Sequence, residues 1–283
     1  MNSNVELTIS IVLYKQKYNE IKELLTSIES ISKNIHTTII DNGNDLELKN
    51  KIIENHTDIN YFLSNNVGFG KAHNIAFEHA YIKNSSYHLI LNPDVYFETS
   101  SIEALINFMN ENEDVGLVMP KIRYPNGNIQ HVCKLLPTPF DWIFRRFSPF
   151  RKNVEKRNEK YELRFTGYNK LMEVPSLSGC FMFVRTSVLK EVGGFDERFF
   201  MYAEDVDLCR RIGKNSKTVY YPEAEIIHNY EKGSYKNKKL LYYHIVSAIK
   251  YFYKWGWFFD KERKLINKKT LVQLGYKPKL KSK

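Results

Sequence analysis

The sequence predicts an α/β protein whose mainly parallel sheet is flanked by helices and followed by a helical C-terminal extension. Up to residue 120, short β-branched runs alternate with helical patterns and are joined by short links, which indicates βαβ units. Charge separates the extension from the rest. Residues 231–283 hold 15 Lys/Arg and 3 Asp/Glu, a net of +12, whereas 27 of the 42 basic and 29 of the 32 acidic residues precede them. With 283 residues, 43% of them hydrophobic, the chain is long enough to bury a large core.

Hydrophobic periodicity defines the individual elements. Apolar runs predict strands at 7–14, 36–40, 59–63, 87–91, 115–119, 177–184 and 218–221. Apolar residues spaced by three and four predict helices at 18–31, 48–53, 71–81, 101–110 and 238–259, the last with nine aromatic residues. Between residues 122 and 174, four prolines and the charged run RKNVEKRNEK interrupt the pattern, so this stretch is expected to be a functional loop or disordered.

The composition excludes several classes of protein. Cys133, Cys180 and Cys209 lack CxxC or zinc-type spacing and are interpreted as ordinary buried thiols in a reducing compartment. The N-terminal residues do not resemble a signal peptide, and no apolar run approaches the ~18 residues that span a bilayer, so a cytosolic or membrane-attached protein is expected. Because the first 230 residues are slightly acidic, a wholly basic nucleic-acid binder is not expected.

Three polar motifs directly follow predicted strands, and ligands of parallel sheets bind beyond the carboxyl ends of strands. Asp41 in DNGN, the loop SNNVGFG and Asp94 in NPD are therefore expected to meet in one crevice. Asp41 can accept hydrogen bonds from a base or ribose, or it can close an Asx turn. Asp94 can hold a hard divalent ion, or it can cap a turn. The glycines allow a ligand to approach the backbone, and the helix start after them favours anions.

A denser acidic group lies at Glu204, Asp205 and Asp207, three carboxylates in four residues that repel one another. A helix N-terminus explains such acids structurally. A general base that takes a proton from an acceptor hydroxyl explains them functionally. Arg210 can pair with these acids or with phosphates. His228, after the last predicted strand, is either a structural residue or a metal ligand.

These motifs occur together in one order, and the sequence resembles the family-2 inverting glycosyltransferases with the GT-A fold, in particular their bacterial rhamnosyltransferase-like branch. The resemblance covers residues 5–230 and is carried by SIVLY, DNGN, NNVGFGKAHN, LNPDV, SGCFMFVRTSVLKEVGGFDERFFMYAEDVDLCRR and IIH. It implies a Rossmann-like, nucleotide-diphospho-sugar transferase domain at 1–230, with a donor-binding half at 5–120 and an acceptor and catalytic half at 121–230. Residues 231–283 would then form a basic, aromatic helical extension.

The resemblance also implies roles for the matched residues. Asp205 is similar to the catalytic base, with Glu204 and Asp207 as close supports. Asp94 takes the place of the metal-binding acid of the DXD motif, Asn92 stands where an acid is commoner, and His228 assists at the metal, Mg²⁺ or Mn²⁺. The implied donor-binding residues are Asp41, Asn66, Gly68, Asn92, Asp94 and Arg210. Ser178 and Gly179 would line the acceptor side.

The implied reaction transfers a sugar from a dTDP- or UDP-linked donor to a glycan or lipid-linked acceptor, with inversion of configuration at the anomeric carbon. The product would belong to a surface polysaccharide, such as O-antigen, capsule or cell wall. L-Rhamnose from dTDP-rhamnose is the expected sugar, with galactose, glucose and N-acetylglucosamine as alternatives. The basic aromatic extension indicates peripheral contact with an anionic membrane, at the cytoplasmic face of the inner membrane. Alternatively, its aromatics pack on the catalytic domain or in a homodimer. A nucleotidyltransferase, a non-catalytic glycan-binding module and a nucleic-acid-binding protein are the rival readings.

Overall fold

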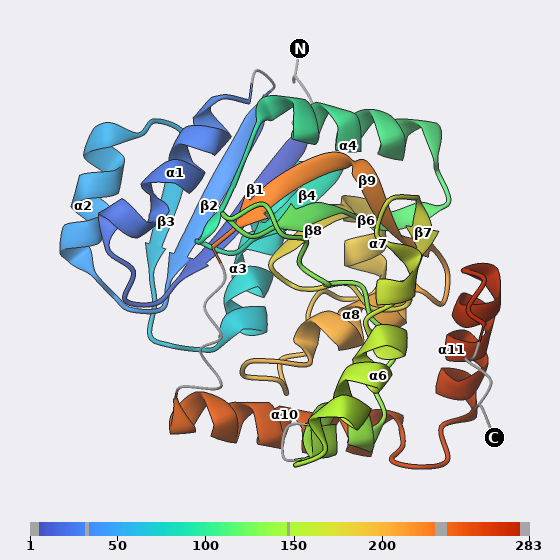
Figure 1. The fold of residues 1–283 in the computed structure, drawn as a ribbon. Helices are drawn as coiled ribbons and strands as arrows, with labels where there is room; N and C mark the ends of the chain where they lie inside the picture. The colour runs from blue at the N-terminus through green and yellow to red at the C-terminus, as the bar shows by residue number, and fades with distance from the viewer. Residues whose placement is uncertain (1–5, 32–33, 146–147, 230–236, 278–283) are drawn as a thin grey trace, which may run out of the picture.

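The computed structural model describes residues 6–31, 34–145, 148–229 and 237–277 (Figure 1). A nine-stranded sheet has the order β3-β2-β1-β4-β8-β6-β9-β5, with β7 paired to β9. The strands are β1 Leu7–Leu13, β2 Ile35–Asp41, β3 Ile59–Leu63, β4 Tyr87–Leu91, β5 Val95–Phe97, β6 Val115–Arg123, β7 Met172–Glu173, β8 Phe181–Arg185 and β9 Lys217–His228. The α-helices are α1 Tyr18–Glu29, α2 Leu46–Asn55, α3 Phe69–Ile82, α4 Thr99–Glu111, α6 Arg151–Tyr161, α7 Thr186–Glu191, α8 Glu204–Ile212, α10 Lys238–Trp255 and α11 Lys261–Gln273, with short helices η1 Phe140–Phe144 and η2 Arg164–Thr166.

The sheet is parallel up to β4, as the βαβ pattern predicted. β1 pairs in parallel with β2 and β4, and β2 pairs in parallel with β3. β1 is buried along its whole length, which is typical of a parallel strand covered on both faces. Beyond β4 the sheet is mixed, because β8 runs antiparallel to both β4 and β6 whereas β6 and β9 are parallel. Helix α3 packs on β1 and β2, and α4 packs on β9 and β6.

A chain of hydrogen bonds crosses the interior between β1, β4 and α3. Thr8 Oγ1 lies 2.8 Å from His88 Nδ1, His88 Nε2 lies 2.8 Å from Ser10 Oγ, and Ser10 Oγ lies 2.7 Å from His73 Nδ1. Burial lowers the pKa of His88 to about 3, and burial together with the nearby His88 ring lowers the pKa of His73 well below its ordinary value. Both rings are therefore neutral in the folded protein near pH 7.

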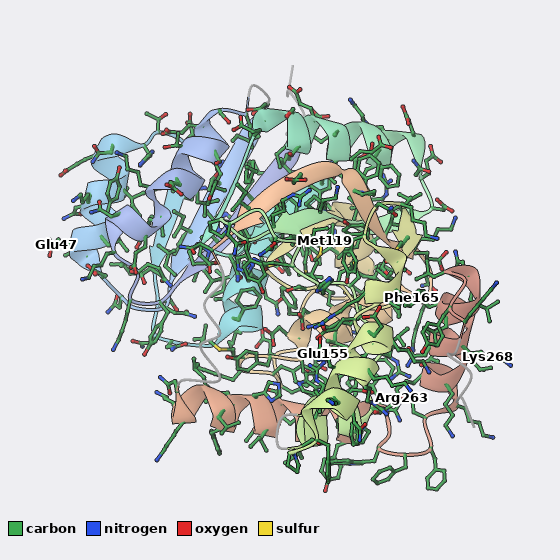
Figure 2. The ribbon with its side chains drawn as sticks, viewed as in Figure 1. Glu47, Met119, Glu155, Phe165, Arg263 and Lys268 are labelled. Atoms are coloured by element: carbon green, nitrogen blue, oxygen red, sulfur yellow. The ribbon has the colours of Figure 1, made fainter. Side chains whose placement is uncertain are left out.

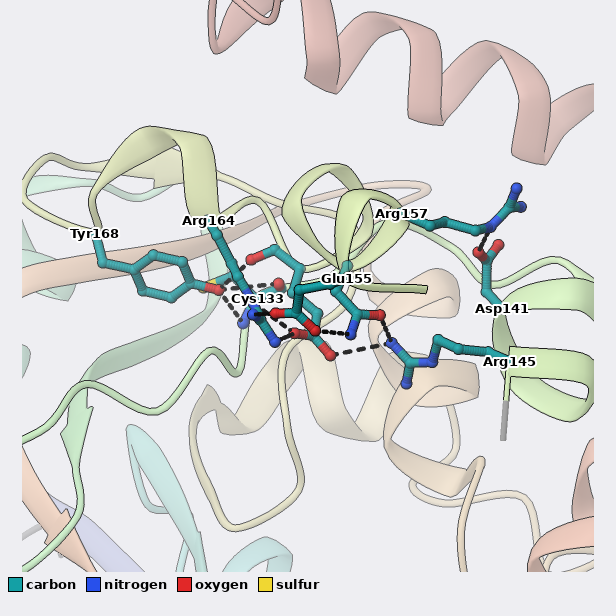
Figure 3. A network of polar contacts seen from close by, with 9 residues as sticks. Cys133, Asp141, Arg145, Glu155, Arg157, Arg164 and Tyr168 are labelled. Carbon is teal, nitrogen blue, oxygen red and sulfur yellow. Dashed lines mark hydrogen bonds and ion pairs between the residues drawn. The ribbon is translucent and has the colours of Figure 1, made fainter. Parts of the chain in front are cut away.

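The charged run RKNVEKRNEK forms helix α6, which corrects the expectation of an irregular segment. Its buried apolar residues are Val154 and Tyr161, seven positions apart, so the sequence lacks the broad apolar stripe by which amphipathic helices are recognised. Ion pairs hold the helix to its neighbours: Arg157 pairs with Asp141, and Glu155 pairs with Arg164 (Figure 3). Directly after the helix, Glu162 pairs with Arg145 and Arg164.

The C-terminal region contains two helices, whereas one helix was expected over 238–259. Gly256, with φ of +99°, ends α10, and α11 follows. Tyr251 and Phe252 on the inner face of α10 are fully buried in a cluster with Phe199 and Val206. In Figure 1, α10 lies along the lower edge of the molecule and α11 along the right side. The extension thus packs firmly on the segment that leads into α8.

The three cysteines are buried and free, which confirms their interpretation as ordinary thiols. In the part of the chain that the structure describes, no helix has both the length and the apolar character to cross a membrane.

Candidate active site

Two loops leave the sheet side by side where β4 ends and β8 begins. Leu91, the last residue of β4, pairs with Phe181, the first residue of β8. The NPD turn therefore starts beside the SGC segment, and the Asn92 N–H donates to the Cys180 carbonyl at 2.9 Å. Two motifs that lie far apart in the sequence thus meet at one edge of the sheet.

Asp205 is held against the SGC segment from the N-terminus of α8. Its Oδ2 accepts the Gly179 N–H at 3.0 Å, and its Oδ1 accepts the Val206 N–H at 2.8 Å. A Cβ at Gly179 would lie 3.2 Å from the Asp205 Cβ, so glycine permits the approach. Burial raises the pKa of Asp205 and Lys134 lowers it, with a net rise. Both Asp205 and Ser178 remain partly exposed, so a ligand can reach them.

Glu204 is more deeply buried than Asp205. Its Oε2 has no hydrogen-bond partner among the described residues. Burial and the neighbouring Asp205 carboxylate raise the pKa of Glu204 to about 8. A buried ionised carboxylate with one unpaired oxygen is costly. Burial therefore favours the protonated form of Glu204.

Asp94 is brought beside His228 by strand pairing. β5 follows the NPD turn at once and pairs antiparallel with the end of β9, with Val95 opposite His228. As a result, His228 Nε2 lies 3.3 Å from Asp94 Oδ1. Burial lowers the pKa of His228, but Cys180 and Asp94 more than offset this effect, and the pKa lies above its ordinary value.

Gln130 holds the His228 ring from the other side. Its Oε1 is 3.0 Å from His228 Nδ1, and its Nε2 donates to the His228 carbonyl at 2.7 Å. Sequence reasoning missed Gln130 because it lies in the proline-rich stretch, where no spacing or strand pattern singled it out.

The carboxylate of Asp41 is engaged in its own turn. It is fully buried and accepts hydrogen bonds from the N–H groups of Gly43 at 2.7 Å and Asp45 at 2.8 Å, and from the Tyr61 hydroxyl at 3.0 Å. This geometry corresponds to the Asx-turn alternative. A contact between Asp41 and a donor stays a prediction.

The glycine loop joins that turn to the segment before α8. The Asn42 amide donates to the Gly68 carbonyl at 3.1 Å. Gly68 has a φ of +93°, and a Cβ there would lie 2.4 Å from the Phe200 carbonyl oxygen, so the position requires glycine. The Phe69 N–H donates to the same oxygen at 2.9 Å. Asn66 is exposed in this loop, and its Oδ1 accepts the Gly68 N–H at 3.2 Å.

Asp207 does not join Asp205, although both were predicted for the catalytic group. Two residues along a helix turn a side chain by about 200°, so Asp207 points to the opposite face of α8. There it is fully buried and binds Arg211 Nε at 2.7 Å, Trp255 Nε1 at 2.8 Å and Lys254 Nζ at 2.6 Å. We therefore assign Asp207 to the attachment of α10.

Arg210 also turns away from the predicted donor site. Its guanidinium donates to both oxygens of Asp260, at 2.7 and 2.9 Å, and to Glu262 at 2.7 Å. It also lies 4.1 Å from the centre of the Trp255 ring. With its charge neutralised and its side chain buried, Arg210 anchors the start of α11 and corrects the expectation of a phosphate contact.

A metal could be held at Asp94 and His228, which offer a carboxylate oxygen and an imidazole nitrogen. No group of three His, Cys, Asp or Glu residues suited to a metal occurs in the described ranges. An ion here would therefore need further oxygen ligands, and a donor diphosphate can supply them. The pair fits Mg²⁺ or Mn²⁺ bound together with a nucleotide, because Mg²⁺ commonly combines one or two carboxylates with substrate phosphates.

The fold and these motifs agree with a known family. A model of glycosyl transferase family 2 matches residues 9–193, more than half of the chain, and the chain belongs to this family.

Two relatives in particular resemble the chain in sequence. The N-acetylglucosaminyl-diphospho-decaprenol L-rhamnosyltransferase of Mycobacterium tuberculosis (strain CDC 1551 / Oshkosh) is 35% identical over 149 residues, 50% of this chain and 46% of that protein. The match thus spans about half the length of this relative. Rhamnosyltransferase WbbL of Escherichia coli (strain K12) is 25% identical over 241 residues, 82% of this chain and 87% of that protein.

Solved structures confirm the predicted GT-A fold. Mannosyltransferase PcManGT from Pyrobaculum calidifontis, in complex with GDP-Man and Mn²⁺, has a TM-score of 0.57 at 14% identity, covering 97% of this chain and 76% of its own. GalNAc-T7 with UDP, GalNAc and Mn²⁺ has a TM-score of 0.61 at 15% identity, covering 81% and 44%.

Proposed function

We propose that this protein is an inverting glycosyltransferase that moves a sugar from a nucleoside diphosphate donor to a glycan or lipid-linked acceptor. One observation carries the proposal. The hydrogen bonds from Asn92 to Cys180 and from Gly179 to Asp205 bring the NPD turn and the acidic N-terminus of α8 to the same edge of the sheet. A single displacement needs a base for the acceptor and a charged site for the leaving group, and these two motifs supply them.

Asp205 acts as the base in this proposal. It takes the proton of an acceptor hydroxyl, whose oxygen then attacks the anomeric carbon while the bond to the diphosphate breaks on the opposite face. The configuration at that carbon is inverted as a consequence. A raised pKa suits a base that works near neutral pH. Ser178 and Gly179 would line the acceptor side, and neutral Glu204 would leave Asp205 as the charged member of the pair.

The donor side consists of the NPD turn and the neighbouring loops. Asp94 and His228 would hold Mg²⁺ or Mn²⁺, and such an ion would neutralise charge on the departing diphosphate. Asn92 would add an amide oxygen to the ribose or the metal. The loop with Asn66 and Gly68 leads into α3, whose N-terminal N–H groups favour phosphate. Asp41 would contact the base from its turn.

The relatives guide the choice of substrates. Two matched relatives are rhamnosyltransferases, and the M. tuberculosis relative is named for a diphospho-decaprenol substrate. We therefore propose L-rhamnose from dTDP-rhamnose as the transferred sugar, with another hexose as the alternative. The acceptor would be a lipid-linked saccharide of a surface polysaccharide, reached at the cytoplasmic face of the inner membrane. Residues 1–230 would form the catalytic domain and 231–283 the extension. A homodimer is compatible with this scheme, and no nucleic-acid partner is proposed.

A thermal-shift screen of nucleotide sugars with Mg²⁺ or Mn²⁺ tests the donor. We expect a sugar nucleotide to raise the melting temperature more with the ion than without it, because only the folded site binds the donor. The best donor is then used in a transfer assay with a synthetic lipid-diphosphate saccharide. If no sugar nucleotide shifts the melting temperature and none is consumed, the transferase proposal is wrong.

A further inference from the structure

The two faces of helix α10 have opposite surroundings. Its inner face packs on the catalytic segment: Tyr243 stacks on Phe200 with ring centres 4.5 Å apart, and Ser247 Oγ donates to the Met201 carbonyl at 2.8 Å. This segment leads directly into Glu204 and Asp205 at the start of α8. The outer face lies on the lower edge of the molecule in Figure 1, and its side chains project away from the protein in Figure 2.

The outer face carries large apolar side chains in a regular row. Tyr242, Ile249 and Tyr253 are spaced by seven and four residues, which places them on one side of a helix. Tyr242 is 62% exposed and Tyr253 78%. The row continues after the helix into Phe258, 65% exposed, and Phe259, 93% exposed. Among the described residues, four of the eight exposed large aromatics fall between 242 and 259, so this concentration is not a general property of the surface.

Basic residues surround this aromatic row. The segment from Lys238 to Gln273, which holds both helices and their link, contains nine Lys or Arg and two Asp or Glu, a net of +7. Both acids, Asp260 and Glu262, are bound to Arg210. Lys238, Lys239, Lys261 and Lys264 are exposed, and in the described ranges no acidic side chain forms an ion pair with them. Aromatic residues with unpaired lysines around them match an anionic interface, where rings enter the headgroup layer and lysines meet lipid phosphates.

We propose that this aromatic row and its lysines form a docking surface for an anionic bilayer, with α10 lying in the plane of the membrane. Phe259, the most exposed residue of the row, and Phe258 beside it enter the headgroup region. The inference deepens the proposed function, since it rests on a lipid-linked acceptor for its purpose. Docking by the outer face of α10 would hold the inner face, and with it the segment before Asp205, close to the surface where such an acceptor is presented.

Vesicle sedimentation tests the surface without donor or acceptor. Wild-type protein is expected to bind phosphatidylcholine vesicles that contain about a quarter phosphatidylglycerol, and to bind pure phosphatidylcholine at least about tenfold more weakly. The double variant Phe258→Ser/Phe259→Ser should weaken binding to the anionic vesicles about tenfold or more, at low and high salt. Lys261→Glu/Lys264→Glu should weaken it chiefly at low salt, because salt screens charge.

Ile82→Ser is the matched control, because Ile82 is 79% exposed at the end of α3 and lies outside the row. It should bind vesicles like the wild type. Tyr253→Glu provides an independent variant if the double phenylalanine variant is poorly folded, and it should also reduce binding. Unchanged donor-induced thermal shifts show that each variant keeps its fold.

Three results would overturn the proposal. In the first, the wild-type protein does not bind anionic vesicles. In the second, the Phe258→Ser/Phe259→Ser and Tyr253→Glu variants bind them as well as the wild type does. The third result is a dimer in sedimentation velocity that Tyr253→Glu dissociates. The last result would make the row a subunit interface. Sugar transfer in solution by a protein that fails to bind vesicles would refute the docking surface and leave the transferase proposal intact. Vesicle binding without any transfer would do the reverse.

Discussion

Substituting Asp205 with Asn removes the proposed base and leaves the shape of the site in place. The amide oxygen can still accept the Gly179 N–H, so the SGC segment keeps its contact, and only the hydrogen bond from the Val206 N–H is lost. General base catalysis contributes typically 10²–10⁴ in rate, or about 3–5 kcal/mol of transition-state stabilisation. Transfer should therefore fall by that factor, whereas donor affinity and melting temperature stay close to the wild type. Initial rates at saturating donor measure the first effect, and calorimetry measures the others.

Asp207→Asn is the matched control, two residues further along the same helix. Asp207 is buried with Lys254 and Arg211, so removal of its charge leaves Arg211 without its carboxylate, while Lys254 keeps only Asp196. Breaking a buried ion pair costs about 3–5 kcal/mol, which lowers the melting temperature by on the order of 10 °C. Well below that temperature, transfer should persist. If Asp205→Asn turned over at the wild-type rate, or if Asp207→Asn lost transfer without losing stability, the assignment of the two acids would be reversed.

Three further perturbations test other parts of the structure. Asp94→Ala should abolish the difference in donor affinity with and without Mn²⁺, and titration calorimetry that still finds this difference would refute the metal role. Arg210→Ala leaves the buried Asp260 with Arg263 alone, so the free energy of unfolding should fall by about 3 kcal/mol while donor affinity is unchanged. Weaker donor binding by folded protein would return Arg210 to the donor site. His73 and His88 have lowered pKa values in the folded state, so only the unfolded chain takes up their protons between about pH 6.5 and pH 3. The free energy of unfolding is therefore highest above the pKa of the unfolded rings and falls as pH decreases, by up to about 1.4 kcal/mol per pH unit for each ring. In urea unfolding, the free energy of unfolding of His88→Gln should depend less steeply on pH than that of the wild type, and an equal dependence would contradict neutral burial of His88.

Much of the fold could be predicted because the parallel strands combine apolar runs with turns at their ends. The run LTISIVL and the NPD turn after β4 show how a strand and a polar motif can both be read from neighbouring residues. Helix α6 was missed because it lacks a broad apolar stripe and its polar side chains pair with residues outside the helix, as Arg157 does with Asp141. Long-range partners of this kind leave no periodic signal.

The same limit explains why the contacts of the candidate site residues could not be predicted from the sequence. Pairing of β5 with β9 places His228 beside Asp94, and no local pattern reveals the register of that pair. The acidic cluster was recognisable as a group in the sequence. Which of its side chains face the candidate site and which face the extension depends on how α8 is rotated about its axis relative to the core. Asp207 and Arg210 face the extension because the helix turns them away from Asp205. The sequence before α10 does not indicate that residues of the extension will bind them.

In this arrangement the extension helps to position Asp205, the proposed base. The family match ends at residue 193, before α8 begins, yet α8 is held by residues that lie later still. Asp207 binds Lys254 and Trp255, and Arg210 binds Asp260. Without the extension, Asp207 would keep only Arg211 of α8 as a charged partner, and the Arg210 guanidinium would lose both of its carboxylates. The helix that presents Asp205 is thus oriented from both sides, by Gly179 in the catalytic part and by α10 and α11 behind it. A shift of α10, whether caused by its packing or by membrane docking, would therefore move α8 and with it Asp205, the proposed base.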